Sequence, residues 1–393
     1  MFKSGTVAQS AERGAMPRGG KRASVLVIGA YLCFLFAMAG WTFLQSAHDW
    51  DMIGYMAVIT SWQTPNPVEM HRTVYQQLRR ITSPATYEEL TTGPFRGDVA
   101  ANPWHLAEQL PFYSIKPLYV NLVWLGHRFG LRLDRSMRLV SVLSVLALGI
   151  LCFQWMRIYL TDLQGAIISA CLFITAPMHR LARFHEPDAL NAAVLVASLY
   201  FLFEKKKSFP GLLLLCMSVL IRPDSVILAL LVLAYLATWA PARLAIRKSH
   251  ALVLAGTVAA SVVAIGRLSG NYGWKMLFIN TFIAPVPNPG EITAVVTRSD
   301  YWAALRGCSI QLLSGDGLVI FAFFIALLLL VGAATVEPQL RDLVILLAVA
   351  IACHIALFPS LQARFYAFAL VPTTVAFAAC LARRKQLGPE HSA

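Results

Sequence analysis

The amino-acid sequence predicts an all-α polytopic membrane protein of about ten transmembrane helices, with a large outer first loop that carries surface helices. Of its 393 residues, 58% are hydrophobic and only 13% are charged, a composition typical of membrane proteins. Several apolar stretches reach the roughly 20 residues that cross a ~30 Å hydrocarbon core as a helix. Short charged turns separate these stretches, as is usual between transmembrane helices.

Ten apolar runs are predicted to span the membrane. Together they define one integral membrane domain over 23–382, between an N-terminal tail (1–22) and a C-terminal tail (383–393). The first run resembles a signal peptide, since Lys21-Arg22 precede it, but it is long enough to cross the bilayer and we expect an uncleaved anchor. The ten runs are 23–44, 136–156, 164–182, 188–203, 209–222, 225–242, 250–268, 317–336, 343–359 and 364–382.

Basic residues predict the orientation in the plasma (inner) membrane. With ten spans, the clusters at 205–207, 243–248 and 383–385 all fall on the side of the basic N-terminus. Lys and Arg are enriched in cytoplasmic loops, so both termini are predicted to be cytoplasmic and the long loops to face outward. The net charge of +13 therefore reflects membrane orientation. Because the cations lie at span ends and form no basic helix or patch, we expect membrane lipids and no nucleic acid as partners.

Two outer segments, about 45–135 and 269–316, are too long to be simple connections. The first opens with HDWDMIGYMAVITSW (48–62), which places Asp49 and Asp51 just after the first span, and continues into a polar stretch rich in Pro and Gly. It also contains the apolar segment 110–130, interrupted by Lys116-Pro117. Counting this segment as a span would reverse every later loop, so we expect an amphipathic helix on the outer membrane surface.

Three short outer connections carry charges at the membrane boundary, where ionisable groups are costly unless they are solvated, paired or used. Taken singly, each residue could extend to the lipid headgroups or cap a helix. Taken with Asp49 and Asp51, they predict one cluster of mixed sign at one membrane depth. The residues are Arg183, Glu186 and Asp188 in HRLARFHEPDAL, Arg222 and Asp224 in LIRPDSV, and Arg364 in LQARFYAFALVP.

Such a cluster suits glycosyl transfer from a lipid phosphate. Arg side chains pair with phosphate oxygens in a bidentate manner. A nearby carboxylate can take the proton from an attacking hydroxyl or amine. Because a phosphate is already a good leaving group, an inverting displacement needs little more than one carboxylate base and these phosphate contacts.

The layout resembles the GT-C superfamily of membrane glycosyltransferases, which use polyprenyl- or dolichyl-phosphate sugars. Asp51 and Tyr55 match the Asp and the aromatic residue of an acidic motif in the aminoarabinose and protein O-mannosyl branches, whereas Met52 stands where these branches have Glu. The resemblance implies an inverting enzyme that moves a sugar from a polyprenyl-phosphate donor to a glycan, lipid or protein acceptor at the outer face. Asp51 would be the base, and Asp49 either replaces the missing Glu or is a solvated helix-end residue.

The stretch 183–202 resembles the second outer loop and fourth span of the family, with Asp188 at the matching acidic position. Arg222-Pro223 and Arg364-Phe365 resemble patterns in its late spans. The resemblance and the charge placement together imply catalytic roles for Asp51, Asp49 and Asp188. They imply substrate-binding roles for Tyr55, Arg183, Glu186, Arg222, Asp224 and Arg364.

Other side chains have two interpretations each. His48 and His185 precede acidic residues and could complete an oxygen-rich Mg²⁺ or Mn²⁺ site with the carboxylates, although Asp49 and Asp51 alone point apart. His354 lies within a span, where a hydrogen-bonded core histidine is favoured over a proton relay. Five tryptophans near the outer interface fit an aromatic belt better than sugar stacking, namely Trp41, Trp50, Trp62, Trp104 and Trp124.

Two other functions fit the same composition. A transporter or flippase of a lipid-linked or anionic substrate would line a path with these arginines, but it should carry ionisable residues and broken helices near mid-span. The predicted spans are nearly free of interior charge. A scaffold or assembly subunit without activity is the third interpretation, and Met52 is the residue that best supports it.

Overall fold

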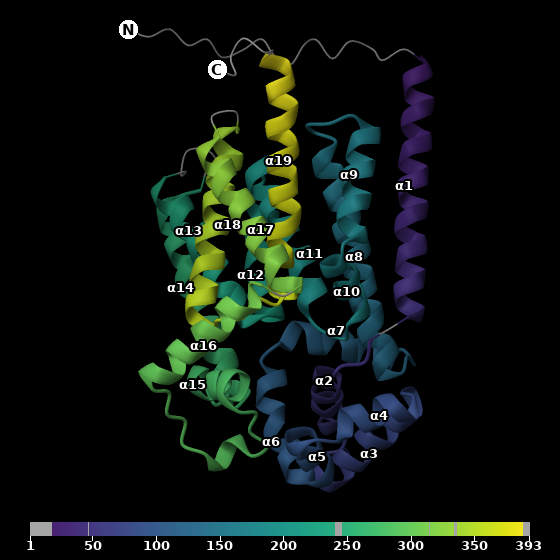
Figure 1. Cartoon of the computed structure of the whole chain (residues 1–393), viewed down its shortest axis with the longest axis vertical. Coiled ribbons are helices and arrows are strands. Elements are labelled where there is room, and N and C mark those ends of the chain that lie inside the picture. Colours follow the sequence, from purple (N-terminus) through teal and green to yellow (C-terminus); the bar gives the residue numbers. More distant parts are fainter. Residues whose placement is uncertain (1–17, 46, 240–245, 314, 334–335, 388–393) are drawn as a thin grey trace.

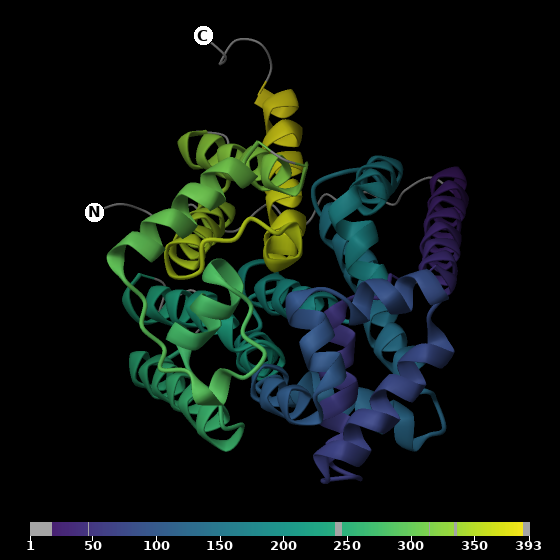
Figure 2. The same ribbon diagram turned by 60° about the horizontal axis from the view of Figure 1, so that its bottom comes forward.

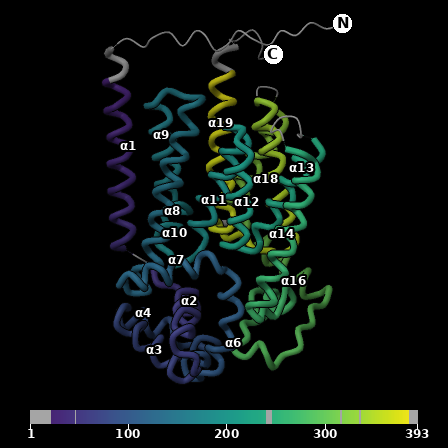
Figure 3. The backbone as a smooth tube through the Cα atoms, turned by 180° about the vertical axis from the view of Figure 1, so that it is seen from behind, coloured from purple at the N-terminus to yellow at the C-terminus, as the bar shows by residue number. Residues whose placement is uncertain are grey.

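A computed structural model describes residues 18–45, 47–239, 246–313, 315–333 and 336–387, and over these residues the chain forms helices and no strand (Figure 1). Long helices run side by side in a bundle, and a second group of helices lies beyond one end of it. We call the second group the end block; it comprises α2 to α7 with α15 and α16. The start of α1 (Arg18–Leu44) and the end of α19 (Ala367–Leu387) lie at the opposite end of the bundle (Figures 1 and 3).

Several helices are apolar enough to embed the protein in a membrane. Five are also long enough to cross it, within α1, α8 (Leu133–Met156), α14 (Lys248–Leu268), α18 (Pro338–Leu357) and the stretch that runs from η5 (Ala363–Tyr366) into α19. A sixth is obtained if α9 (Asp162–Ile174) and α10 (Ala176–Arg183) are one span. The other predicted spans coincide with shorter helices, so the number ten stays a prediction. These are α11 (Asp188–Leu199) with the π-helix η1 (Tyr200–Glu204), α12 (Ser208–Ile221), η2 (Pro223–Ser225) with α13 (Val226–Thr238), and α17 (Gly315–Gly332).

The predicted span 164–182 is bent. Its two halves, α9 and α10, meet at an angle of 66°. Thr175 between them has an extended backbone, and Pro177 lies in the first turn of α10. Since proline has no backbone N–H with which to continue the helical ladder of α9, the second half starts a new helix in another direction.

The end block contains more helices than the one predicted over 110–130. After α2 (Trp50–Ser61), each of the next five helices begins with a proline, the position where a missing N–H costs least. Asn66, Ser83 and Asn102 cap three of them with side-chain hydrogen bonds to backbone N–H groups. The helices are α3 (Pro67–Ile81), α4 (Pro84–Thr91), α5 (Pro94–Ala101), α6 (Pro103–Ser114) and α7 (Pro117–Arg128), and the break between the last two falls at Lys116-Pro117, as predicted.

Helix α2 is the central helix of the end block. All nine residues from Met52 to Thr60 are buried, and they pack against the inner faces of α3, α6 and α7. With 12 residues, α2 is too short to cross a bilayer, which explains an apolar run that is not a span. The surrounding helices therefore fix the position of Asp51 in its first turn.

The second long outer segment packs against the first. It contains α15 (Trp274–Phe278), the π-helix η3 (Ile279–Ile283), η4 (Pro289–Glu291) and α16 (Arg298–Gln311). The Gln109 side chain on α6 donates to the carbonyls of Val286 and Pro287 at 2.9 and 3.0 Å, and the Gly290 N–H donates to Glu108 at 2.9 Å. Figure 2 brings the end block forward and shows both segments at the same end of the bundle.

Candidate functional site

The predicted cluster of charges forms where the start of α2 meets the ends of bundle helices. Asp51 comes from the first turn of α2, whereas Asp188 begins α11. Arg222 follows α12, Asp224 lies in η2, and Arg364 lies in η5 before α19. All these segments reach the same end of the bundle, so residues far apart in the sequence become neighbours.

The Arg364 guanidinium is the centre of the cluster. Its Nη1 atom forms an ion pair with Glu186 and lies 3.5 Å from Asp51 Oδ2 and 3.8 Å from Asp188 Oδ2. Its Nε donates to Gln362 at 2.8 Å. Since no residue in the described part of the chain bonds Nη2, this group can donate to an oxygen of a ligand.

Arg222 joins the cluster through two carboxylates. Its Nε and Nη2 atoms donate to the two oxygens of Asp224 at 3.0 and 2.6 Å, and its Nη1 forms an ion pair with Asp188. The Phe365 ring lies 4.7 Å from the Arg222 guanidinium and 5.0 Å from that of Arg364. The ring contacts both cations, and its attraction for each of them offsets part of their mutual repulsion.

Asp51 has one oxygen that is available to a ligand. Tyr113 donates to its Oδ1 at 3.1 Å, whereas Oδ2 lies 3.5 Å from Arg364, beyond a good hydrogen bond. The Asp51 side chain is 36% exposed and that of Arg364 is 24% exposed, against 4% for Glu186 and for Asp188. A substrate can therefore reach Asp51 and Arg364, while the two buried carboxylates hold the arginines in place.

Asp49 has a different role in the geometry. Its Oδ1 accepts the Met52 N–H at 3.0 Å and caps the N-terminus of α2, whereas its Oδ2 is buried without a hydrogen-bond partner. Burial, together with the neighbouring Asp51 carboxylate, raises the pKa of Asp49 well above its usual range. Asp49 is therefore a helix cap that is costly to ionise.

Lys116 is a member of the site that the sequence did not point to. Its Nζ donates to the Tyr55 hydroxyl at 2.6 Å and lies 5.0 and 5.3 Å from the centres of the Tyr55 and Tyr113 rings. Burial lowers the pKa of Lys116 to about 8, although the nearby Asp51 carboxylate acts in the opposite direction. The available signal was the single lysine that interrupts the apolar segment 110–130.

His354 of α18 extends the cluster into the bundle. Its Nε2 lies 3.3 Å from Asp224 and its Nδ1 3.0 Å from the Tyr366 hydroxyl, which donates to the Ser360 carbonyl. This agrees with the expected hydrogen-bonded core histidine, and it also fixes Asp224 opposite Arg222. Tyr113 and His354 thus orient carboxylates of the site.

Arg183 is not part of the cluster. Its Nε donates to the Gln45 carbonyl at 2.6 Å, and the Ala47 N–H donates to the Arg183 carbonyl at 3.1 Å. These bonds tie the linker between α1 and α2 to the end of α10. Arg183 therefore orients the linker, and the phosphate-binding role predicted for it has no support from its position.

His48 and His185 lie together, but they face a cation. Their rings stack at 5.4 Å, and Arg138 Nε donates to His185 Nε2 at 3.1 Å and its Nη2 lies 3.3 Å from His48 Nε2. Burial, helped by Arg138, lowers the pKa of His185 to about 3. Asp134 pairs with Arg138 at 3.4 Å. The two histidines therefore anchor the loop that carries Glu186 and do not point toward the carboxylates of the cluster.

A divalent cation remains a prediction. Within the part of the chain that the structure describes, no group of three or more His, Cys, Asp or Glu side chains is arranged to hold a metal ion. Glu186, Asp188 and Asp224 each contact a guanidinium. Among the described residues of the cluster, five carboxylates, namely Asp49, Asp51, Glu186, Asp188 and Asp224, lie close to the three cations Lys116, Arg222 and Arg364 and to the His354 imidazole, so the carboxylates outnumber the cations.

No family model matches the chain, and neither the curated proteins nor the solved structures contain a match.

Proposed function

We propose that this protein is an inverting glycosyltransferase of the plasma membrane that uses a polyprenyl-phosphate sugar. The observation that carries the proposal is the Arg364 guanidinium, whose one Nη1 group faces Asp51, Glu186 and Asp188. An accessible carboxylate beside guanidiniums at the end of an apolar bundle supplies both a base and a phosphate site. The fold that goes with the proposal is GT-C-like, with about ten spans, cytoplasmic termini and the end block outside.

In the proposed reaction, Asp51 Oδ2 accepts the proton of the acceptor hydroxyl or amine. The acceptor atom then attacks the anomeric carbon from the face opposite the phosphate, and the bond from that carbon to the phosphate oxygen breaks. The phosphate leaves with the bonding electron pair and the configuration inverts. Arg364 Nη2, with Arg222 and Lys116 nearby, would stabilise the developing charge on the phosphate oxygens.

The excess of carboxylates over cations in the site would repel the phosphate of an anionic donor. Asp49 has a raised pKa and contributes less negative charge when it is protonated. Asp51 and the donor phosphate are the groups that would hold a Mg²⁺ or Mn²⁺ ion, whose positive charge would offset the remaining excess. Assays in EDTA and in added Mg²⁺ or Mn²⁺ distinguish protonation of Asp49 from metal binding. Only metal binding predicts a KM for the donor that depends on the metal.

The transfer assay uses purified protein in proteoliposomes and a panel of undecaprenyl-phosphate-linked sugars, with release of undecaprenyl phosphate as the readout. For Asp51→Asn we expect a loss of turnover of about 10²–10⁴-fold, the range for a general base. Glu88→Gln, an exposed carboxylate change in the end block, should leave turnover unchanged. Both variants are compared with the wild type by gel filtration and circular dichroism.

Near-normal turnover of correctly folded Asp51→Asn protein would contradict the assignment of Asp51 as the base, and absence of transfer from every lipid-linked sugar with the wild type would contradict the proposed activity. The transporter alternative predicts a different result in the same vesicles. Wild-type protein would then move the intact lipid-linked sugar between leaflets, and the bond between sugar and phosphate would remain unbroken.

A further inference from the structure

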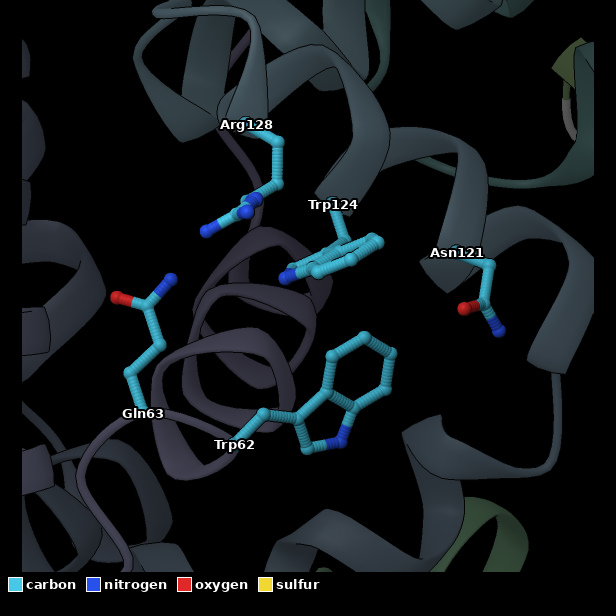
Figure 4. A pocket seen from close by; sticks show the side chains of 5 residues that line it. All are labelled: Trp62, Gln63, Asn121, Trp124 and Arg128. Carbon is cyan, nitrogen blue, oxygen red and sulfur yellow. The ribbon is translucent and has the colours of Figure 1, made fainter.

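A second potential binding site lies at the other end of α2 from Asp51. A pocket of about 290 Å³ opens on the surface of the end block between the end of α2 and helix α7 (Figure 4). Its volume is near the lower limit for small-molecule sites. The pocket is lined by Trp62, Gln63, Asn121, Trp124 and Arg128.

Two indole rings form the apolar part of this pocket. Trp62 is 47% exposed, and its ring meets that of Trp124 edge to face, at 6.2 Å and 66°. The Arg128 guanidinium lies 5.7 Å from the centre of the Trp124 ring. Arg128, the cationic residue among those that line the pocket, therefore contacts the Trp124 ring. The Trp62 ring remains exposed and can contact a ligand.

Two amide side chains form the polar part. Figure 4 shows Gln63 and Asn121 on either side of the two indoles. The Asn121 amide donates to the Pro117 carbonyl at 2.8 Å, and this bond orients its oxygen as an acceptor. An amide group both donates and accepts hydrogen bonds, so the two side chains suit a ligand that carries many hydroxyl groups.

We infer that this pocket binds a glycan. A pyranose ring has an apolar face of C–H groups, which stacks on an indole, and a hydroxyl edge, which bonds to amides. A phosphate would bond to Arg128 but would leave the Gln63 and Asn121 amides and the exposed Trp62 ring without partners. A purely apolar ligand would leave the Gln63, Asn121 and Arg128 side chains without partners.

The position of the pocket defines the class of acceptor, a step that rests on the proposed function. Asp51 and Trp62 are eleven residues apart on and beside α2, which is about 16 Å along a helix. One sugar cannot occupy both positions. The acceptor is therefore an oligosaccharide or polysaccharide, of which one end reaches Asp51 while a later sugar is held by Trp62.

Binding is tested by calorimetry on the full chain in nanodiscs, with three tetrasaccharides as probes: β-1,4-linked glucose, β-1,4-linked N-acetylglucosamine and α-1,6-linked mannose. We expect at least one to bind the wild type at millimolar concentration and Trp62→Ala to weaken it by about tenfold. Trp62→Phe, which keeps an aromatic face, should restore most of the affinity. The matched control is Trp104→Ala, which removes a tryptophan of the end block that is 60% exposed and outside the pocket.

The inference is overturned if none of the tetrasaccharides binds, or if Trp104→Ala weakens binding as much as Trp62→Ala does. Quenching by lipids with brominated acyl chains that is lost in Trp62→Ala would also overturn it, because Trp62 would then lie in the bilayer. Transfer assays separate the two proposals. Absence of undecaprenyl phosphate release by the wild type refutes the glycosyltransferase, whereas glycan binding to the Trp62 pocket would stand without it.

Discussion

Asp49 and Asp51 differ in what their oxygens contact, and this difference predicts opposite effects of the same substitution. Asp49→Asn keeps an N-cap of similar quality on α2 and removes the buried carboxylate. We therefore expect turnover in the undecaprenyl phosphate assay within a few-fold of the wild type, in contrast to Asp51→Asn. A correctly folded Asp49→Asn protein without activity would instead identify Asp49 as the base.

The same substitution also changes the pH dependence of stability. Because the folded-state pKa of Asp49 is raised, the folded protein holds a proton that the unfolded chain has released, and the free energy of unfolding falls as the pH rises from the unfolded pKa to the folded one. Asp49→Asn should remove this part of the decrease. Thermal unfolding of both proteins at a series of pH values between about 4 and 8 provides the measurement.

Lys116 predicts an alkaline limit on activity. The ammonium group can assist the donor phosphate only while it is charged, and its pKa is lowered to about 8. We expect kcat/KM to fall as the pH rises through about 8, since this ratio reports the ionisation of the free enzyme. Lys116→Met should lower activity near neutral pH and abolish this limb.

Lys275→Met, at an exposed lysine on α15, is the control for Lys116→Met and should keep the wild-type pH profile. An alkaline limb that persists in Lys116→Met would assign the ionisation to another group.

The charged members of the site could be predicted because charge at a membrane boundary is conspicuous in an apolar sequence. Asp51, Glu186, Asp188, Arg222 and Arg364 converge as expected. Arg183 looked equivalent, but a charge in a loop does not show which way its side chain points. Tyr113 and Lys116 were missed, because they enter the site through the packing of α6 and α7 on α2, and this packing has no signature in the sequence.

At the level of helices, α2 depends on a close approach that only glycine permits. A Cβ atom on Gly54 would lie 2.4–2.6 Å from ring carbons of Tyr113. Gly54→Ala should therefore displace Tyr113, whose hydroxyl donates to Asp51, and destabilise the fold by about 1–3 kcal/mol. We expect turnover to fall by about tenfold as this hydrogen bond is lost.

Gly97→Ala in α5 is the matched control for Gly54→Ala. Its added Cβ atom meets nothing closer than 3.6 Å, so the change should be neutral or should stabilise the helix by about 0.5–1 kcal/mol. Thermal unfolding and the transfer assay are run on both variants. Equal behaviour of the two would show that Tyr113 is not held by the contact with Gly54.

The helices themselves were predictable to different degrees. Long apolar runs identified α1, α8 and α18 within a few residues, because hydrophobic length is a strong signal. The bend at Thr175 and the separate starts of α3, α4, α5 and α6 were missed, although Pro177 marks the bend and the pairs Asn66-Pro67, Ser83-Pro84 and Asn102-Pro103 mark three of these starts. In a polar stretch these prolines read as turns, and only tertiary packing shows that a helix follows each one.

At the level of the whole molecule, the site lies at the seam between the end block and the bundle. Asp51 and Lys116 come from the end block, whereas Asp188, Arg222 and Arg364 come from the bundle. Such a seam would give a lipid-linked donor access from the bilayer and an acceptor access from the aqueous side. This arrangement requires the end block to face outward, which the basic clusters of the sequence predict and which can be measured directly.

Single cysteines placed in a background without the seven native cysteines test this orientation. Glu88→Cys lies on the exposed surface of the end block, and Lys207→Cys lies in the exposed turn between η1 and α12. If basic turns face the cytoplasm, a membrane-impermeant maleimide should label Glu88→Cys in intact cells and Lys207→Cys only after permeabilisation. The reverse pattern would invert the topology, and labelling of both in intact cells would mean that α8, α9 with α10, and α11 with η1 do not all cross the bilayer.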